Sequence, residues 1–376
     1  MHDSGSAAKP PAEQPTAEPD GVERDERTSL LGLDAAELQQ EVGDRLRPAF
    51  RLRQLDDALH RQVVRSFGEA TSFSLEDRAW LDSSFSVGRP RLVDRVPSAD
   101  GTEKSLFELQ DGATIESVDI PDGARRTFCI SSQAGCALAC RFCVTGYWGA
   151  GRNLTAGEII GQVYSLREQA ELPWERINLV FMGMGEPLLN LDPVRRALDK
   201  LTLHIPWPKI TVSTAGLVPG IREMASWDER PNLAVSLHAA DDVTREQIMP
   251  INRKYPLDDL FEALAEYPVT RSRKLTFEYI LIRGLNDTPR HARDLVRRLH
   301  GLRSRVNLIP FNPDPVLGDL APPDENVVDA FRQSLVDSGV RAVVRRPRGD
   351  DVAAACGQLR AFGRRPRGFP GIPSTA

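Results

Sequence analysis

The chain has 376 residues, of which 41% are hydrophobic, and its formal net charge is −5. This length is enough for one large domain with a small accessory one. No uninterrupted apolar stretch approaches the roughly 18 residues that a membrane span needs, and the first thirty residues lack the hydrophobic core of a secretion signal. The odd number of cysteines, five, argues against a secreted disulfide framework. We therefore expect a cytoplasmic protein with no membrane partner.

The two ends of the chain differ in charge. Residues 1–28 are predicted to form a disordered tail, because their prolines, alanines and acids cannot bury enough apolar surface. That segment carries seven acids and three bases, whereas the chain from Arg341 onward carries eight arginines and two aspartates. This asymmetry suits a local phosphate-binding face better than the total charge suggests. For the arginines at 364–367 the alternative is a solvated tail.

Residues 29–85 have the pattern of a small N-terminal helical domain. Asp34 is placed to cap the first predicted helix. Apolar residues recur at helical spacing in this segment: Leu38 and Val42, then Leu52, Leu55, Leu59 and Val63. Opposite the second stripe lie four arginines: Arg51, Arg53, Arg61 and Arg65. A basic helix face is either ordinary surface or an RNA contact, and both interpretations stay open.

Residues 86–122 change to short strands with Asp-Gly turns, and we expect a β-hairpin linker. Its strands are predicted at 104–109 and 113–120, joined at Asp111-Gly112. Alternation along the second strand places Glu116 on the same face as Val118 and Ile120. A carboxylate on an apolar face pairs with a base or acts as one. The alternative is an edge-strand glutamate that points into water.

Residues 123–350 alternate predicted strands and helices, which is typical of an α/β fold. Six strands are expected, at residues 128–131, 177–183, 210–214, 233–238, 275–282 and 306–310. Thr155 and Glu158 form a capping box at one helix start. Right-handed crossovers between six such units give a curved parallel sheet, a partial (βα)6 barrel. Chemistry in barrels gathers at the carboxyl ends of the strands.

Three cysteines form one closely spaced group, Cys136-x-x-x-Cys140-x-x-Cys143, shortly after the first barrel strand. Three thiolates on a four-iron cluster leave one iron open for a substrate or cosubstrate. A structural zinc site normally has four protein ligands in two paired groups, and the nearest histidine, His204, lies in a different segment. We favour the iron–sulfur cluster. Structural zinc and reduced core thiols are the alternatives.

Polar or glycine-rich motifs follow several predicted strands. Glycines let the backbone approach a ligand closely, and Glu186 can hold an ammonium group. The candidate ligand-binding residues are Gly185, Glu186, Ser213, Ser236, Leu237, His238 and Asn312. Because they lie at the same end of the inferred sheet, we expect one binding site. The alternatives are a hydrogen-bonded rim histidine for His238 and a turn before Pro313 for Asn312.

The remaining cysteines complete a pattern that resembles the RlmN/Cfr family of radical S-adenosylmethionine (SAM) RNA methyltransferases. The triplet has the spacing of radical SAM enzymes, Cys129 lies seven residues before it, and Cys356 stands in Ala355-Cys-Gly-Gln-Leu359. The resemblance extends from about Leu30 to Arg360. It implies a radical-SAM barrel over residues 123–350 and a catalytic-cysteine loop with a basic tail over 351–376. An inert core cysteine is the alternative for Cys356.

The resemblance implies methylation of carbon 2 of an adenosine in the peptidyl-transferase centre of 23S rRNA, and of an adenosine next to the anticodon in tRNA. Two SAM molecules would be used per turnover, one of them to methylate Cys356. Cys129 would release the product by forming a transient disulfide, with Glu116 or Cys129 as the base. The triplet would hold a [4Fe–4S] cluster, and the strand-end residues would bind SAM. The implied partners are 23S rRNA, tRNA and a low-potential electron donor such as flavodoxin. The resemblance also implies a monomer whose N-terminal domain binds RNA.

Three other activities remain as alternatives. Within the family, the rival is methylation of carbon 8 of the same rRNA adenosine, although Pro187 after Gly-Glu favours carbon 2. Another radical SAM enzyme acting on a protein would share the triplet but would need neither Cys129 nor Cys356. A zinc-bearing RNA adaptor would share only the basic faces. Tyr147 and Trp148 depart from the family's usual small or amide residues, and such aromatics suit stacking on a base or packing beside the cluster.

Overall fold

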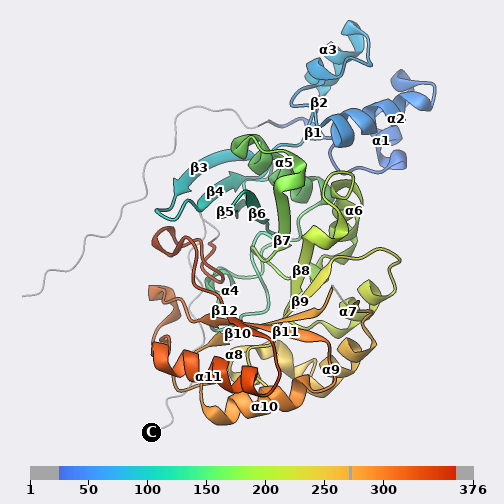
Figure 1. Ribbon diagram of the computed structural model, residues 1–376. Helices are drawn as coiled ribbons and strands as arrows, with labels where there is room; N and C mark the ends of the chain where they lie inside the picture. Colours follow the sequence, from blue (N-terminus) through green and yellow to red (C-terminus); the bar gives the residue numbers. More distant parts are fainter. Residues whose placement is uncertain (1–24, 271–272, 361–376) are drawn as a thin grey trace, which may run out of the picture.

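A computed structural model describes residues 25–270 and 273–360, which form a large α/β body with a smaller helical domain at one end (Figure 1). Most of the predicted N-terminal tail and all arginines beyond Arg360 lie outside the described residues. Within the described ranges, no helix is both long enough and apolar enough to span a bilayer.

The small domain contains the helices α1 (Ala35–Val42), α2 (Phe50–Asp57) and α3 (Leu75–Ser84), and the paired strands β1 (Thr28–Ser29) and β2 (Phe85–Ser86). Asp34 caps α1 as predicted, because its side chain accepts the backbone N–H groups of Ala36 and Glu37. The π-helical turn Ala58–Gln62 continues α2. The predicted apolar stripe from Leu52 to Val63 is buried. These buried residues are continuous with the hydrophobic core of the large body.

A ten-stranded sheet organises the large body, in the order β12-β11-β10-β9-β8-β7-β6-β5-β4-β3. Neighbouring strands are parallel from β6 to β12 and antiparallel from β3 to β6. The strands are β3 (Arg91–Pro97), β4 (Glu103–Glu108), β5 (Thr114–Asp122), β6 (Arg125–Cys129), β7 (Ile177–Phe181), β8 (Ile210–Thr214), β9 (Asn232–Ser236), β10 (Leu275–Leu281), β11 (Ser304–Pro310) and β12 (Ala342–Val344). The expected hairpin is present as β4 and β5, and it extends the sheet.

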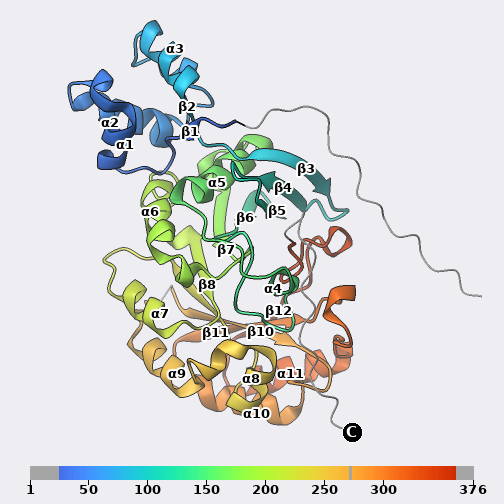
Figure 2. The same ribbon diagram turned by 180° about the vertical axis from the view of Figure 1, so that it is seen from behind.

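Helices cover the outside of this curved sheet, as Figure 1 and the reverse view in Figure 2 show. They are α5 (Ala156–Ala170), α6 (Leu191–Leu201), α7 (Val218–Ala225), α8 (Asp242–Ile248), α9 (Leu257–Glu266), α10 (Pro289–Leu299) and α11 (Glu325–Asp337). Thr155 and Glu158 form the predicted capping box of α5. All seven residues of β10 are buried, as expected for a parallel strand covered on both faces. The short α4 (Val144–Tyr147) follows the cysteine loop instead.

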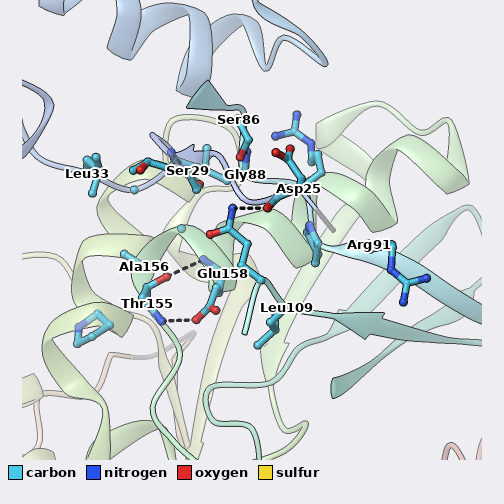
Figure 3. Close-up of a pocket in the computed structure, with 18 of the residues that line it drawn as sticks. Asp25, Ser29, Leu33, Ser86, Gly88, Arg91, Leu109, Thr155, Ala156 and Glu158 are labelled. Carbon is cyan, nitrogen blue, oxygen red and sulfur yellow. Dashed lines mark hydrogen bonds between the residues drawn. The ribbon is translucent and has the colours of Figure 1, made fainter. Parts of the chain in front are cut away.

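Ion pairs attach the small domain to the body. Arg196 of α6 pairs with Glu37, and Lys200 pairs with Asp56 at 2.5 Å. A pocket of about 550 Å³ lies in this joint, lined by the small domain, β3, β4 and the first turn of α5 (Figure 3). None of the cysteines or the strand-end candidates lines it. This pocket is therefore separate from the residues that the sequence singles out for chemistry.

Candidate active site

The cysteine triplet lies in a loop that leaves the carboxyl end of β6 and leads into α4. The loop folds on itself: the N–H of Cys136 donates to the carbonyl of Gly149 at 2.9 Å, and that of Cys143 to the carbonyl of Cys140 at 3.1 Å. Gly135 has a φ of +136°, and a Cβ atom there would lie 2.5 Å from the Gly149 oxygen. The close approach of the two loop segments therefore requires glycine at position 135.

The chemistry of these three thiols fits an iron–sulfur cluster. Burial, followed by the charge of Cys143, raises the pKa of Cys136 to about 12, and burial with its two partners raises the pKa of Cys140. The thiolates thus repel one another and need a cationic partner. Among the described residues, no three His, Cys, Asp or Glu side chains surround a point where one metal ion would sit. A [4Fe–4S] cluster binds each cysteine through a different iron, so its ligands stand farther apart than those of zinc.

Glu186 lies beside this loop, just after β7. Its buried carboxylate accepts the N–H of Ala215 at 2.7 Å and that of Leu188 at 3.0 Å, so it joins the ends of β7 and β8. Its own N–H donates to the Gln133 side chain at 2.8 Å. Burial raises the pKa of Glu186 to about 7, although these hydrogen bonds lower it. A cationic ammonium group would favour the ionised form, as the predicted SAM contact requires.

The next candidate, His238, follows β9 with a left-handed φ of 59°. Its Nδ1 accepts the N–H of Ile280 at 3.0 Å, so the neutral ring carries its proton on Nε2. Burial, with a smaller effect of Arg245, lowers the pKa of His238 to about 3. Phe142 of the cysteine loop packs edge-on against the ring, with centroids 4.5 Å apart. The cysteine loop and the end of β9 are therefore in direct contact.

The other strand-end candidates lie where the sequence predicts. Ser213 is the penultimate residue of β8, and Ser236 is the last residue of β9. Leu237 directly follows β9, and Asn312 comes two residues after β11. Ser213 and Ser236 are half-buried, and Leu237 and Asn312 are buried. Gly185, next to Glu186, has a φ of +99°. The structure thus brings all seven candidates to the carboxyl edge of the sheet, around the cysteine loop.

The two isolated cysteines lie on segments that border the cysteine loop. Cys129 ends β6, and Cys356 lies in the loop after Asp350–Val352. Burial, and after it the charge of Cys356, raises the pKa of Cys129. Both are free thiols. Cys356 is exposed to solvent, yet enough protein surrounds its sulfur to raise its pKa as well. This combination suits a thiol that faces an open reaction space.

Glu116 is fully buried in β5, which excludes the interpretation of an edge glutamate in water. Its Oε1 lies 3.0 Å from the Nζ of Lys104 in β4, and its Oε2 accepts the N–H of Arg360 at 2.7 Å. Burial raises the pKa of Glu116, and Lys104 is the largest influence in the opposite direction. The carboxylate therefore touches the segment that carries Cys356.

That segment is held at both ends. At its C-terminal end, the N–H of Val144 donates to the carbonyl of Gly357 at 2.6 Å, and the Thr145 hydroxyl donates to the carbonyl of Leu359 at 2.8 Å. At its N-terminal end, the Asp351 carboxylate accepts the Ser98 hydroxyl at 2.6 Å and the Ala99 N–H at 3.0 Å. The β3–β4 turn and α4 thus fix a loop whose centre is Cys356.

The sequence interpretation missed two buried cations of this site, Lys104 and Arg245. Lys104 could have been predicted from the hairpin register, which pairs it with Val118. Val118 lies two residues after Glu116 on the same face of β5, so Lys104 and Glu116 are diagonal neighbours. Arg245 gives no such signal, since α8 has an ordinary surface-helix sequence.

Comparisons with known proteins agree with this geometry. Residues 130–296 match the model of the Radical SAM superfamily, and these residues contain the triplet and most strand-end candidates. A crystal structure of a radical SAM methyltransferase from Sphaerobacter thermophilus superposes with a TM-score of 0.81 at 38% identity, covering 88% of this chain and 99% of that one. The fold is therefore that of a radical SAM methyltransferase, and the predicted α/β radical-SAM architecture is confirmed.

Curated relatives narrow the class. A dual-specificity RNA methyltransferase RlmN from Syntrophobacter fumaroxidans is 45% identical over 325 residues, which cover 85% of this chain and 93% of the relative. A probable dual-specificity RNA methyltransferase RlmN from Gemmatimonas aurantiaca is 46% identical over 326 residues, which cover 85% of this chain and 88% of that relative. The chain belongs to the RlmN family of radical SAM RNA methyltransferases. It is thus an enzyme that acts on RNA with SAM as methyl donor, and the protein-modifying and adaptor alternatives are wrong.

Proposed function

We propose that this enzyme methylates carbon 2 of an adenosine in the peptidyl-transferase centre of 23S rRNA and of an adenosine next to the anticodon in tRNA. The observation that supports this proposal best is that the loop of Cys356 contacts both the end of the cysteine loop and the carboxylate of Glu116, while Cys129 ends β6, the strand paired with β5. Simple transfer from SAM to a nucleophile needs none of these three groups. Carbon 2 of adenine is electrophilic, so it cannot attack the SAM methyl group, and the carbon must arrive by another route.

The triplet would hold a [4Fe–4S] cluster, which supplies the electron that cleaves SAM reductively and so starts radical chemistry. Glu186, Gly185 and His238, with Ser213, Ser236, Leu237 and Asn312, would orient SAM at the carboxyl edge of the sheet. Two SAM molecules are used per turnover, one as methyl donor and one as radical source. An external low-potential donor such as flavodoxin supplies the electron.

The chain's own residues perform the remaining steps. The Cys356 thiolate takes a methyl group from the first SAM, which leaves as S-adenosylhomocysteine. The deoxyadenosyl radical released from the second SAM removes one hydrogen atom from that methyl group, and the carbon radical left on the Cys356 sulfur adds to carbon 2 of the adenine ring. Glu116, with Cys129 as the other candidate, accepts the proton that leaves carbon 2. The Cys129 thiolate then attacks the sulfur of Cys356, which breaks the bond from that sulfur to the transferred carbon and forms a disulfide. The released carbon takes up a proton to become the methyl group of the product, and the one surplus electron of the radical adduct returns to the electron-donor chain. A reductant reopens the disulfide for the next turnover.

Nucleoside mass spectrometry of a deletion strain tests this proposal. We expect 2-methyladenosine to disappear from both 23S rRNA and tRNA and to return with the wild-type gene. A strain that keeps 2-methyladenosine and loses only the 8-methyl isomer would instead show carbon 8 chemistry. The enzyme is proposed to act as a monomer in the cytoplasm, and sedimentation of the purified protein with and without RNA checks its oligomeric state.

A further inference from the structure

Arg245 is the largest fully buried side chain among the described residues, and its position is unusual for a cation. It comes from α8, and its guanidinium reaches under the ends of β8 and β9. The Nη2 atom donates to the carbonyl of Ala215 at 2.7 Å and to that of Ser236 at 3.3 Å, and Nε donates to the carbonyl of Leu237 at 3.1 Å. Arg245 therefore connects the two strand ends that carry Ser213, Ser236 and His238.

All these acceptors are neutral. The fourth hydrogen bond, from Nη1, goes to the side-chain oxygen of Asn252 at 2.9 Å. Among the described residues Arg245 forms no ion pair, although Lys104, the other buried cation of the site, pairs with Glu116. A buried charge without an anion is costly, and a neutral donor would hold the same carbonyls at lower cost. The positive charge itself therefore needs a partner.

Two groups supply negative charge near Arg245, Cys140 of the cysteine loop and Asp242 of α8. Asp242 reaches Arg245 only through Asn252, whose side-chain N–H donates to the Asp242 carboxylate at 2.8 Å. The carbonyl of Ile248, at the end of α8, accepts the N–H of Arg141 at 3.0 Å, which attaches the helix directly after Cys140. Burial lowers the pKa of Arg245 to about 10 and raises the pKa of Cys140. Against burial, the charges of Cys140 and then Asp242 favour the cationic form of Arg245, and the charge of Arg245 favours the thiolate form of Cys140. A [4Fe–4S] cluster with three thiolate ligands is an anion, and it gains a further negative charge on reduction.

We propose that Arg245 is a positioning residue whose buried charge is the protein's counter-ion to the cluster, stabilises the reduced state and fixes the strand ends that contact SAM. This inference rests on the proposed cofactor. It explains why the position holds a cation with neutral hydrogen-bond partners, because the anion belongs to the bound group. Arg245 touches no reacting atom, so its effect appears in the cluster's reduction potential.

A matched pair of variants separates charge from geometry. Arg245→Lys and Arg245→Gln both shorten the side chain and both can donate to carbonyls, but only lysine keeps the charge. Each protein is reconstituted anaerobically, its iron content is measured, and the cluster is titrated with reductant by electron paramagnetic resonance without RNA. We expect R245K to stay near the wild-type potential. In R245Q the ratio of reduced to oxidised cluster at a fixed potential should fall roughly tenfold.

Equal potentials for R245K and R245Q would overturn the proposal. A wild-type protein that acquires no cluster signal would refute the proposed cofactor instead, so the two failures are distinguishable. If R245Q retains no cluster, the melting temperatures of cluster-free R245Q and R245K are compared instead, because they show whether the buried charge has an anionic partner within the protein. R245Q should then melt at or above the temperature of R245K, because the lysine charge has no anion without the cluster. A cluster-free R245K that is several degrees more stable would place the counter-ion within the protein and contradict the inference.

Discussion

At the scale of single residues, the ionisation of Glu116 depends on its burial and on its ion pair with Lys104. Glu116 is fully buried, and that burial raises its pKa, yet Lys104 at 3.0 Å favours the ionised form. A proton acceptor must be ionised before it can act. Lys104 therefore favours the form of Glu116 that the proposed role as a base requires. The same lysine reaches the carbonyl of Ala353 at 3.4 Å, in the loop of Cys356.

Replacing Lys104 with methionine should move the pH dependence of product formation. An opposite charge within about 4–6 Å lowers a carboxyl pKa by roughly 1–3 units, so its loss raises the pKa of Glu116 by a similar amount. Because the ionised base is the active form, the acid limb of the pH–rate profile should shift to higher pH. Rates of methyladenosine formation across pH, measured with reconstituted enzyme at saturating RNA, check this.

Lys104→Arg is the matched control, since it keeps the charge and should keep the wild-type profile. Glu116→Gln should lower the rate by roughly 10²–10⁴-fold at every pH, as for the loss of a general base. If the K104M profile coincides with that of the wild type, Glu116 is not the proton acceptor and Cys129 takes that role.

At the scale of elements, the antiparallel strands β3 to β5 act as a support for the Cys356 loop. The β3–β4 turn binds the loop before the cysteine through Ser98 and Asp351, and β5 binds it afterwards through Glu116 and Arg360. Side-chain hydrogen bonds to Ser98 first, and then the N–H of Ala99, lower the pKa of Asp351, so this contact persists at neutral pH. The hairpin therefore positions the Cys356 loop.

Asp351→Ala should loosen the loop and leave the barrel intact. Loss of two hydrogen bonds should speed amide hydrogen exchange at residues 353–357 by roughly fivefold or more. Methylation of Cys356 should slow in parallel, because the thiol spends less time in position. Asp122→Ala, an exposed change at the far end of β5, serves as the control. Unchanged exchange in D351A, measured by mass spectrometry, would show that the loop is held elsewhere.

The sequence predicts the regular elements better than the connections between them. The strand 210–214 has the same bounds in β8, because this alternating run rich in β-branched residues lies between Pro208-Lys209 and Ala215-Gly216. The seventh parallel strand, β12, was not predicted: it has three residues, and arginines follow it directly. Arg245 could not be predicted, because its burial depends on a loop that lies about a hundred residues away in sequence.

At the scale of the whole molecule, the helical domain is attached to α6 by ion pairs and to α5 by the close packing of Gly32 on Gly157, and it extends away from the barrel (Figure 1). Of the four predicted RNA-contacting arginines, Arg53, Arg61 and Arg65 are exposed. Arg51 is half-buried and lies over the rings of Phe50 and Phe73. Arg51 therefore serves the domain's packing, and the other three remain candidates for phosphate contacts.

The triple replacement of Arg53, Arg61 and Arg65 with alanine should weaken RNA binding and reduce its salt dependence. Each lost phosphate contact should reduce the slope of log affinity against log salt by about 0.7–0.9. Filter binding of 23S rRNA fragments at several salt concentrations measures this slope. The equivalent replacement of Arg290, Arg293 and Arg297 on α10, at the opposite end of the molecule, controls for net charge. Equal slopes in the two triple variants would show that the helical domain does not contact phosphates.

The most direct test of the proposed chemistry is mass spectrometry of the reconstituted Cys129→Ala enzyme after incubation with SAM, reductant and substrate RNA. Without the Cys129 thiol, the bond between the Cys356 sulfur and the transferred carbon cannot be broken, so a peptide containing Cys356 should carry the adenosine covalently. Wild-type enzyme should release methylated RNA and show no such adduct. Free 2-methyladenosine formed at the normal rate by the Cys129→Ala enzyme, with no linked peptide, would contradict transfer through Cys356.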